Sequence, residues 1–249
     1  MEQKFGFVIP VYRHGAALAD VIKELERYDF PIIAVDDGND EENKELIKKA
    51  VENGRNAVLV VREKNGGKGA AVSSGVLKAA EMGLTHVFQL DSDGQHDTSK
   101  IPRFLELSKE YPDSVICGCP EYDKNAPQSR VKGREFANMW IHIVTLSRSI
   151  KDAMVGFRIY PVEKVVKVLQ RTFYINKRMG FDIEILVRLF WANVPIISEP
   201  VKISYPKDGI SNFRMFWDNA GISETYTRLY LGMIPRLPLI IYHSLKRKK

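Results

Sequence analysis

Asp91-Ser92-Asp93-Gly94-Gln95 directly follows His86-Val87-Phe88-Gln89-Leu90, an apolar run with the length and composition of a buried strand. Side chains alternate along a strand, so Asp91 and Asp93 project to one side, and the following glycine turn can bring Gln95 round to join them. Ligands bind at the carboxyl ends of strands in α/β sheets. Carboxylate and amide oxygens suit Mg²⁺ or Mn²⁺, so these three residues are candidate metal ligands. An ordinary turn at a strand end is the simpler alternative for this motif alone.

The first half of the chain alternates between short apolar runs and amphipathic stretches, which is the pattern of βαβ units. We expect strands over residues 5–11, 32–35, 57–61, 87–90 and 114–118, and helices over 17–28, 41–52 and 100–111. Further on we expect helices over about 131–150, 181–191 and 215–233, and strands over 157–160 and 194–203. The loop 121–128 has the composition of a flap beside an active site. The predicted fold class is therefore α/β, with a mostly parallel sheet flanked by helices.

A second acidic motif, Val35-Asp36-Asp37-Gly38-Asn39, follows the second expected strand. Neighbouring parallel strands end at the same edge of a sheet, so Asp36 or Asp37 can accept hydrogen bonds from a nucleobase while Asp91 lies nearer the ribose. Helix capping by Asp37 or Asn39 is the structural alternative. Pro10 and Tyr12, which end the first strand, can form the wall of a base pocket.

A third motif, Asn65-Gly66-Gly67-Lys68-Gly69-Ala70, leads into a helix whose amino terminus attracts negative charge. It lacks the spacing of a P-loop, and an alanine stands where a metal-binding hydroxyl would be needed. Lys68 would offer a cation near a diphosphate. The small residues serve equally well to let the helix approach the sheet closely.

Composition places the chain in one ordinary domain with a basic end. The 249 residues are 45% hydrophobic, enough for a substantial core. Most of the net charge of +6 lies in residues 234–249, which contain Arg236, Lys246, Arg247, Lys248 and Lys249 and no acid. The apolar run 237–242 is too short to span a bilayer, which takes about 20 residues. We expect this helical tail to lie on an anionic membrane surface, with a solvated terminus as the alternative.

Nucleic acid is not an expected partner, because aromatic residues are not interleaved with the basic ones. Cys117 and Cys119 are the only cysteines, and their spacing on an expected strand does not suit a disulfide. The first residues lack the apolar core and cleavage site of a signal peptide. We therefore expect a cytoplasmic location, peripheral at the inner face of the cytoplasmic membrane.

Together these motifs resemble the family 2 glycosyltransferases of the GT-A fold, and within them the dolichol-phosphate mannose synthase type. Five segments stand in that family's order and spacing: 8–12, 35–38, 65–71, 91–96 and 156–160. The resemblance implies a nucleotide-sugar-binding half over 1–120, an acceptor half over 121–233 and the tail over 234–249. It also implies that Pro10, Tyr12, Asp36 and Asp37 line the nucleoside pocket, and that Asp91, Asp93 and Gln95 carry Mg²⁺ or Mn²⁺ with the donor diphosphate.

The implied reaction is inverting transfer of a sugar from a UDP- or GDP-linked donor to a polyprenyl phosphate or a glycolipid. A phosphate acceptor is already anionic, whereas a hydroxyl must lose a proton, for which Asp182 is the candidate base and Glu184 the second. The candidate acceptor-binding residues are Ser129, Arg130, Arg134, Arg158, Lys207 and Arg214. Cys119 and Arg134 depart from the usual pattern of the synthase type. A sugar-1-phosphate nucleotidyltransferase is the alternative enzyme class, although it would need a glycine-rich loop after the first strand.

Overall fold

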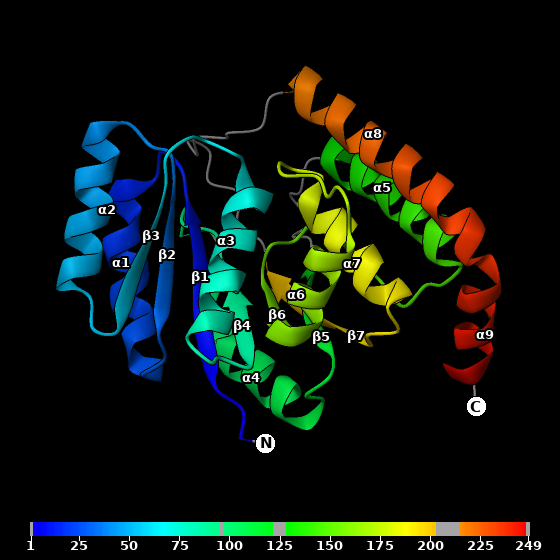
Figure 1. The fold of residues 1–249 in the computed structure, drawn as a ribbon, viewed down its shortest axis with the longest axis horizontal. Coiled ribbons are helices and arrows are strands. Elements are labelled where there is room, and N and C mark those ends of the chain that lie inside the picture. Colours follow the sequence, from blue (N-terminus) through cyan, green and yellow to red (C-terminus); the bar gives the residue numbers. More distant parts are fainter. Residues whose placement is uncertain (1, 95–96, 122–127, 203–214, 248–249) are drawn as a thin grey trace.

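One mixed sheet of seven strands organises the molecule (Figure 1). The computed structural model describes residues 2–94, 97–121, 128–202 and 215–247. The strands are β1 (Phe5–Val11), β2 (Ile32–Asp37), β3 (Ala57–Arg62), β4 (His86–Gln89), β5 (Val115–Glu121), β6 (Arg158–Pro161) and β7 (Ile196–Lys202). Their order is β3-β2-β1-β4-β6-β5-β7, and only β6 runs antiparallel to its neighbours. The expected α/β class with a mostly parallel sheet is confirmed.

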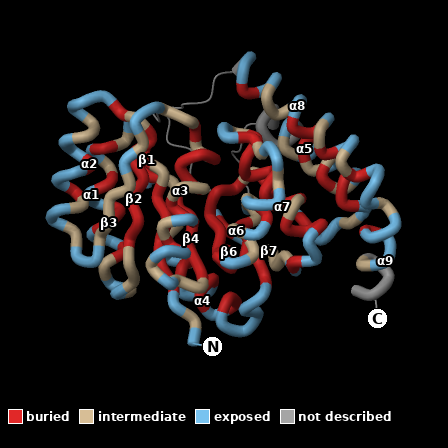
Figure 2. The backbone as a smooth tube through the Cα atoms, in the orientation of Figure 1, coloured by how far each residue is buried: buried red, intermediate tan, exposed pale blue. Residues whose placement is uncertain are grey.

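Helices cover both faces of the sheet. They are α1 (Gly15–Leu25), α2 (Glu41–Asn53), α3 (Lys68–Glu81), α4 (Ile101–Glu110), α5 (Gln128–Thr145), α6 (Val162–Arg171), α7 (Phe181–Trp191), α8 (Met215–Met233) and α9 (Leu237–Arg247). Short 3₁₀ turns lie at Glu26–Tyr28, Thr98–Lys100 and Ile234–Arg236. One core cluster joins the sheet to α1, α2 and α4, and the other joins it to α3, α6 and α7 with α5 and α8 packed outside them. Figure 2 shows buried residues along the central strands and on parts of the helices, with exposed residues toward the outside.

Helix α3 lies unusually close to the sheet because two of its residues have no side chain. A Cβ on Gly75 would collide with Val8 of β1, and one on Gly69 would collide with Phe181 at the start of α7. The close approach to the sheet is seen at Gly75, which lies beyond the glycine-rich motif for which it was expected, whereas Gly69 of that motif packs against α7. This close packing fixes the position of Lys68, the first residue of α3, relative to β1 and α7.

Two features differ from the sequence-based expectation. Helix α6 was not predicted, although its buried Val162, Val165 and Val168 follow helical spacing. The expected tail 234–249 is not separate from the body, because Ile240 of α9 is 3% exposed and belongs to the core cluster that contains Leu229. Among the helices of the described ranges, none combines the length and the apolar character that a membrane span requires.

Candidate active site

The carboxyl ends of β1, β2 and β4 lie side by side at one edge of the sheet. Val11, the last residue of β1, is paired with Asp36 of β2. On its other side β1 pairs in parallel with β4, which leads into Asp91. Parallel pairing is what brings these ends together, and the expected meeting of the acidic motifs at one edge is confirmed.

Lys68 holds two carboxylates together at this edge. Its Nζ lies 2.7 Å from Oδ1 of Asp91 and 3.1 Å from Oδ2 of Asp182. Gln89 Nε2 donates a hydrogen bond of 3.2 Å to Oδ1 of Asp182. A Cβ on Gly156 would lie 2.5 Å from Lys68 Nζ, so a side chain there would shift the ammonium from its present position. We call Lys68, Gln89, Asp91 and Asp182 the Lys68 cluster.

The electrostatics of the Lys68 cluster favour a charged lysine. Burial by itself lowers the pKa of Lys68, but the carboxylates of Asp182 and Asp91 outweigh it, so the pKa lies above its ordinary value. The ammonium is therefore present at neutral pH and neutralises part of the acidic charge. The expected contact of this cation with a diphosphate stays a prediction. The partner carboxylate Asp182 comes from α7, far along the chain.

Arg158 lies beneath the Lys68 cluster rather than facing an acceptor. Its side chain is 0% exposed, and Nη1 donates to the backbone oxygen of Asp182 at 2.7 Å and to the Tyr160 hydroxyl at 3.1 Å. A guanidinium with no exposed surface cannot contact a substrate, so the acceptor role expected for Arg158 is wrong. Strand β6 points this side chain inward, where it supports the first turn of α7.

Glu184 is a buried anchor and not a free carboxylate. It is 0% exposed; Oε1 lies 2.6 Å from Arg188 Nη2, and Oε2 lies 2.6 Å from Arg228 Nη2. Oε2 also accepts a hydrogen bond of 2.7 Å from the backbone N–H of Asn176. The suggestion of Glu184 as second candidate base is therefore corrected, because both oxygens are bound by cations or donors inside the fold.

Of the remaining acceptor candidates, only Arg134 has a side chain that the structure describes. Arg134 Nε lies 2.6 Å from Oδ2 of Asp152, which is itself buried, so this guanidinium faces an internal carboxylate rather than an acceptor. Ser129 and Arg130 belong to the first turn of α5, but their side chains are outside the described part of the structure. Lys207 and Arg214 also lie outside the described residues, as does most of the expected flap 121–128.

The two acids after β2 organise the neighbouring turns. Asp36 accepts hydrogen bonds from the backbone and side-chain nitrogens of Asn39, at 3.0 and 2.6 Å. Asp37 accepts from the backbone N–H groups of Gly66 and Gly67, at 3.0 and 2.7 Å, and from Arg62 Nε at 2.9 Å. Both aspartates are 2% exposed. Asp36 thus fixes the turn after β2, and Asp37 fixes the loop that enters α3. Contact of either aspartate with a nucleoside stays a prediction.

Pro10 and Tyr12 are partly exposed at the end of β1 and just beyond it. The Arg13 guanidinium lies 5.1 Å from the centre of the Tyr12 ring. This aromatic face beside the buried Asp36 is compatible with one wall of a base pocket, which likewise stays a prediction.

The expected metal ligands are described only in part, because Gln95 lies outside the described residues. No group of three His, Cys, Asp or Glu side chains in the described ranges is arranged to hold a metal ion. Asp91 nevertheless has an ammonium 2.7 Å from its carboxylate, which shows that a cation is accommodated there. Asp91 and Asp93 supply the hard carboxylate oxygens that a divalent ion prefers, and their role as metal ligands stays a prediction.

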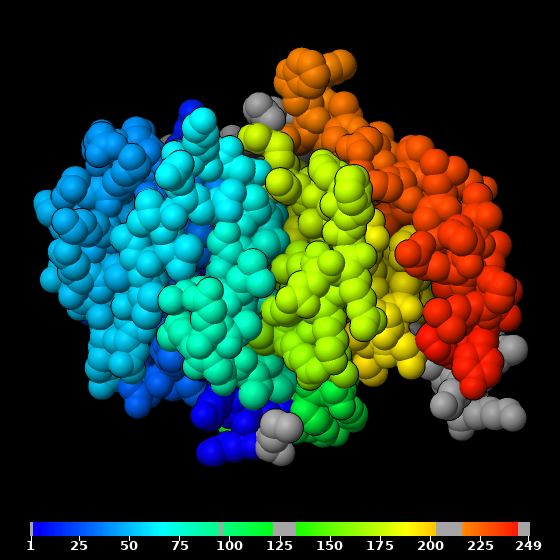
Figure 3. Space-filling view, viewed as in Figure 1, coloured from blue at the N-terminus to red at the C-terminus, as the bar shows by residue number. Residues whose placement is uncertain are grey.

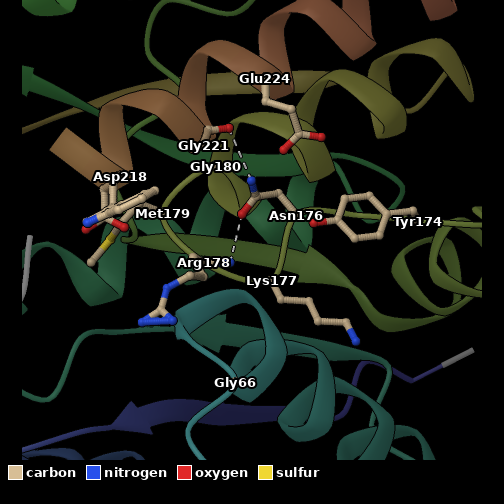
Figure 4. A pocket seen from close by; sticks show the side chains of 11 residues that line it. Gly66, Tyr174, Asn176, Lys177, Arg178, Met179, Gly180, Asp218, Gly221 and Glu224 are labelled. Atoms are coloured by element: carbon tan, nitrogen blue, oxygen red, sulfur yellow. Dashed lines mark hydrogen bonds between the residues drawn. The ribbon is translucent and has the colours of Figure 1, made fainter. Parts of the chain in front are cut away.

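Sequence reasoning missed a cavity of about 500 Å³ beside this edge. Figure 4 shows Lys177 and Arg178 reaching from the segment before α7 toward Gly66, with Asp218 and Glu224 of α8 on the opposite wall. The basic pair directly before Met179-Gly180-Phe181-Asp182 was the available signal. No helix or strand was expected between residues 161 and 180, and this pair was not singled out.

The amino-acid sequence matches a known family model and several curated proteins. The model of the family described as Glycosyl transferase family 2 matches residues 7–176. A dolichyl-phosphate beta-glucosyltransferase of Trichomonas vaginalis is 26% identical over 222 residues, which cover 79% of this chain and 62% of that protein. A UDP-N-acetylglucosamine–dolichyl-phosphate N-acetylglucosaminyltransferase of Methanococcus voltae is 27% identical over 182 residues, or 65% of this chain and 70% of that protein.

Among solved structures, glucosyl-3-phosphoglycerate synthase of Mycobacterium tuberculosis in complex with Mn²⁺, UDP-glucose and phosphoglyceric acid is similar with a TM-score of 0.66. The sequence identity is 16%, and the match covers 93% of this chain and 79% of that one. At this identity the likeness establishes the fold alone. The nucleotidyltransferase alternative finds no support in these matches.

Proposed function

Because this chain belongs to glycosyl transferase family 2, we propose that it is an inverting enzyme that transfers a sugar from a UDP- or GDP-linked donor to a polyprenyl phosphate or a glycolipid. Family membership makes the chain a glycosyltransferase; donor, acceptor and stereochemistry are the proposal. The names of the two relatives, both of which contain dolichyl phosphate, support a lipid phosphate acceptor. The match covers only 62% of the length of the first of these relatives. The substrates named for that relative are therefore only a proposal for this chain.

The Lys68 cluster is the observation that carries this proposal. Breaking the bond between the sugar and the diphosphate places negative charge on the leaving group. Lys68 supplies a cation at the first residue of α3, where the helix dipole also favours an anion. Asp91 keeps this cation at the sheet edge where nucleotides bind in α/β proteins.

Asp91, Asp93 and Gln95 would hold a Mg²⁺ or Mn²⁺ ion beside this cation. When bound, such an ion neutralises charge on the departing diphosphate. The presence of Mn²⁺ with UDP-glucose in the M. tuberculosis synthase supports this assignment, as does the hard-oxygen donor set of this chain.

The state of Asp182 favours an acceptor that needs no protein base. One of its carboxylate oxygens accepts from Gln89 and the other lies against Lys68. A general base needs a lone pair that can reach the proton it removes. A phosphate oxygen is already anionic, so a polyprenyl phosphate can attack while Asp182 remains bound to Lys68. Transfer to a hydroxyl would require Asp182 to leave one of these partners.

A membrane-bound acceptor requires the enzyme to work at a membrane surface. We propose that the basic tail 234–249 makes this contact at the inner face of the cytoplasmic membrane. Leu239, Ile241 and Tyr242 of α9 are exposed although the adjacent Ile240 is buried. Exposed apolar side chains followed by a basic cluster suit an anionic interface.

A donor screen tests the proposal directly. Purified protein is incubated with UDP- and GDP-sugars, with Mn²⁺ or EDTA, and with or without polyprenyl phosphate, and release of nucleoside diphosphate is measured. We expect release that requires one donor, the metal and the acceptor together. Asp93→Asn removes a candidate metal ligand that lies outside the Lys68 cluster, and should lower the rate by about 100-fold or more without unfolding the protein.

Asp20→Asn on the exposed side of α1 is the matched control and should keep the wild-type rate. Undiminished transfer by Asp93→Asn would remove the metal assignment. If no combination of donor and acceptor gives release, the proposed reaction itself is wrong.

A further inference from the structure

The cavity beside the candidate active site has a defined wall of basic and acidic side chains. It has a volume of about 500 Å³ and lies between the segment 174–180, Gly66 and the start of α8. We call it the α8 pocket. A phosphate group and the first atoms attached to it fit easily within such a volume.

Two of the glycines that line the α8 pocket lie close in sequence to members of the Lys68 cluster. Gly66 precedes Lys68 by two residues, and Gly180 precedes Asp182 by two. The segment that carries Lys177 touches the start of α3, because the backbone N–H of Ala70 donates to the Lys177 oxygen at 3.0 Å. A group held in the α8 pocket is therefore next to the residues proposed to hold the donor diphosphate.

The α8 pocket is lined by two basic and two acidic side chains, and the two basic ones lie together on one wall. Lys177 and Arg178 are exposed, and neither side chain forms an ion pair with another described residue. On the opposite wall Glu224 is ion-paired with Arg228, and Asp218 is largely buried. Figure 4 shows the two basic side chains on the side of the pocket that faces Gly66, away from these acids.

A buried hydrogen-bond network holds these two basic residues in place. Asn176 Oδ1 accepts from the backbone N–H of Arg178 at 2.8 Å, and Asn176 Nδ2 donates to Thr225 Oγ1 of α8 at 2.9 Å. The backbone N–H of Asn176 is bound to Glu184, as described above. The backbone on which Lys177 and Arg178 stand is thus ordered before any ligand arrives, which lowers the entropic cost of binding.

We propose that the α8 pocket binds the phosphate monoester of the acceptor, with Arg178 and Lys177 as the residues that contact its oxygens. This inference rests on the proposed function and assigns the acceptor subsite within it. A guanidinium matches two phosphate oxygens at once, and the lysine ammonium adds a point charge. Of the arginines first considered for this role, the structure describes the side chains of two: Arg158 is buried and Arg134 faces Asp152. Arg178, by contrast, is exposed and lines the pocket.

The test measures binding of three probes to the full chain by calorimetry: farnesyl phosphate, farnesol and glycerol 3-phosphate. Wild-type protein should bind a phosphate probe, and K177Q/R178Q should weaken that binding by about tenfold or more. K23Q/R171Q, which removes two exposed basic residues elsewhere, should bind as wild type does. R178K should recover part of the affinity. Preference for farnesyl phosphate over glycerol 3-phosphate identifies a lipid source of the phosphate, and the reverse identifies a soluble one.

Donor binding separates this inference from the proposed function. Affinity for nucleoside diphosphates with Mn²⁺ should be the same in K177Q/R178Q and wild type, and in turnover the KM for the acceptor should rise while the KM for the donor does not. Equal binding of a phosphate probe by K177Q/R178Q and wild type, or tighter binding of farnesol than of farnesyl phosphate, would overturn the pocket assignment. If wild-type protein does not bind any nucleoside diphosphate in the presence of Mn²⁺, the proposed function itself is refuted.

Discussion

At the scale of single residues, Lys68 is the side chain on which the charge balance of the site depends. Lys68→Met would leave Asp91 and Asp182 near each other without their shared cation. We expect the free energy of unfolding in EDTA to fall by about 2–4 kcal/mol, as when one member of a largely buried ion pair is removed. Urea unfolding with and without Mn²⁺ measures this, and Mn²⁺ should restore part of the loss.

Lys78→Met is the matched control for this change, because Lys78 lies on the same helix and pairs with Glu81 at the surface. Exposed pairs contribute little, so its effect should be within about 1 kcal/mol. A Lys68→Met protein as stable as wild type in EDTA would show that the two carboxylates do not need the lysine.

The two cysteines differ in a way that can be measured at the same scale. Burial raises the pKa of Cys117 to about 11, whereas Cys119 is only half-buried. The thiolate is the reactive form, so a raised pKa means that less of it is present at a given pH. We expect iodoacetamide at pH 8 to modify Cys119 before Cys117 in the folded protein, and both at similar rates in urea. Mass spectrometry measures the order, and equal labelling in the folded state would contradict the burial of Cys117.

At the scale of elements, Glu184 joins α7 to α8 and to the segment that enters α7. Glu184→Gln would leave Arg188 and Arg228 without their shared carboxylate. We expect a loss of about 3–5 kcal/mol in the free energy of unfolding, measured by urea denaturation. Glu224→Gln removes only the exposed partner of Arg228 and should have a small effect. Wild-type stability combined with lost transfer would return Glu184 to the role of base.

Most elements of the sheet and its helices could be predicted from periodicity, because their buried residues repeat at strand or helix spacing. The strand over 32–35 and the helix over 181–191 were found within a few residues. Periodicity does not give the direction or the order of strands. The position of antiparallel β6 between β4 and β5 therefore could not be predicted from it. Helix α6 was missed because Pro161, which stops β6, precedes it and was taken only as the end of the strand.

The site was predictable where side chains belong to strand ends and not where they belong to tertiary contacts. The meeting of the acidic motifs follows from parallel pairing alone. The direction of Arg158 depends on which face of β6 is buried, and the partners of Glu184 come from α8, distant in sequence. The α8 pocket likewise could not be predicted from the sequence, because its walls come from three segments that are distant in sequence: Gly66, residues 174–180 and α8.

At the scale of the whole molecule, the basic end and the nucleotide half lie apart. Figure 3 shows α8 and α9 at one end of the molecule and α2 at the other. Side chains of the segment 234–247 pack against the rest of the molecule. The Arg236 guanidinium lies 5.2 Å from the centre of the Trp191 ring, and Ile240 is buried. Removal of the whole segment would therefore disturb the core. The membrane proposal is better tested by changing only its charges.

K248Q/K249Q removes two charges from the end of the chain and should weaken binding to vesicles that contain anionic lipid. Each basic residue near such a surface contributes about 1 kcal/mol, so the expected loss is about 30-fold. K48Q/K49Q on α2 removes the same charge at the opposite end of the molecule and should leave vesicle binding unchanged. Sedimentation with vesicles measures both, and added salt should weaken wild-type binding because it screens the attraction. Equal losses in the two variants would mean that net charge, rather than the orientation set by α9, attracts the protein to the membrane.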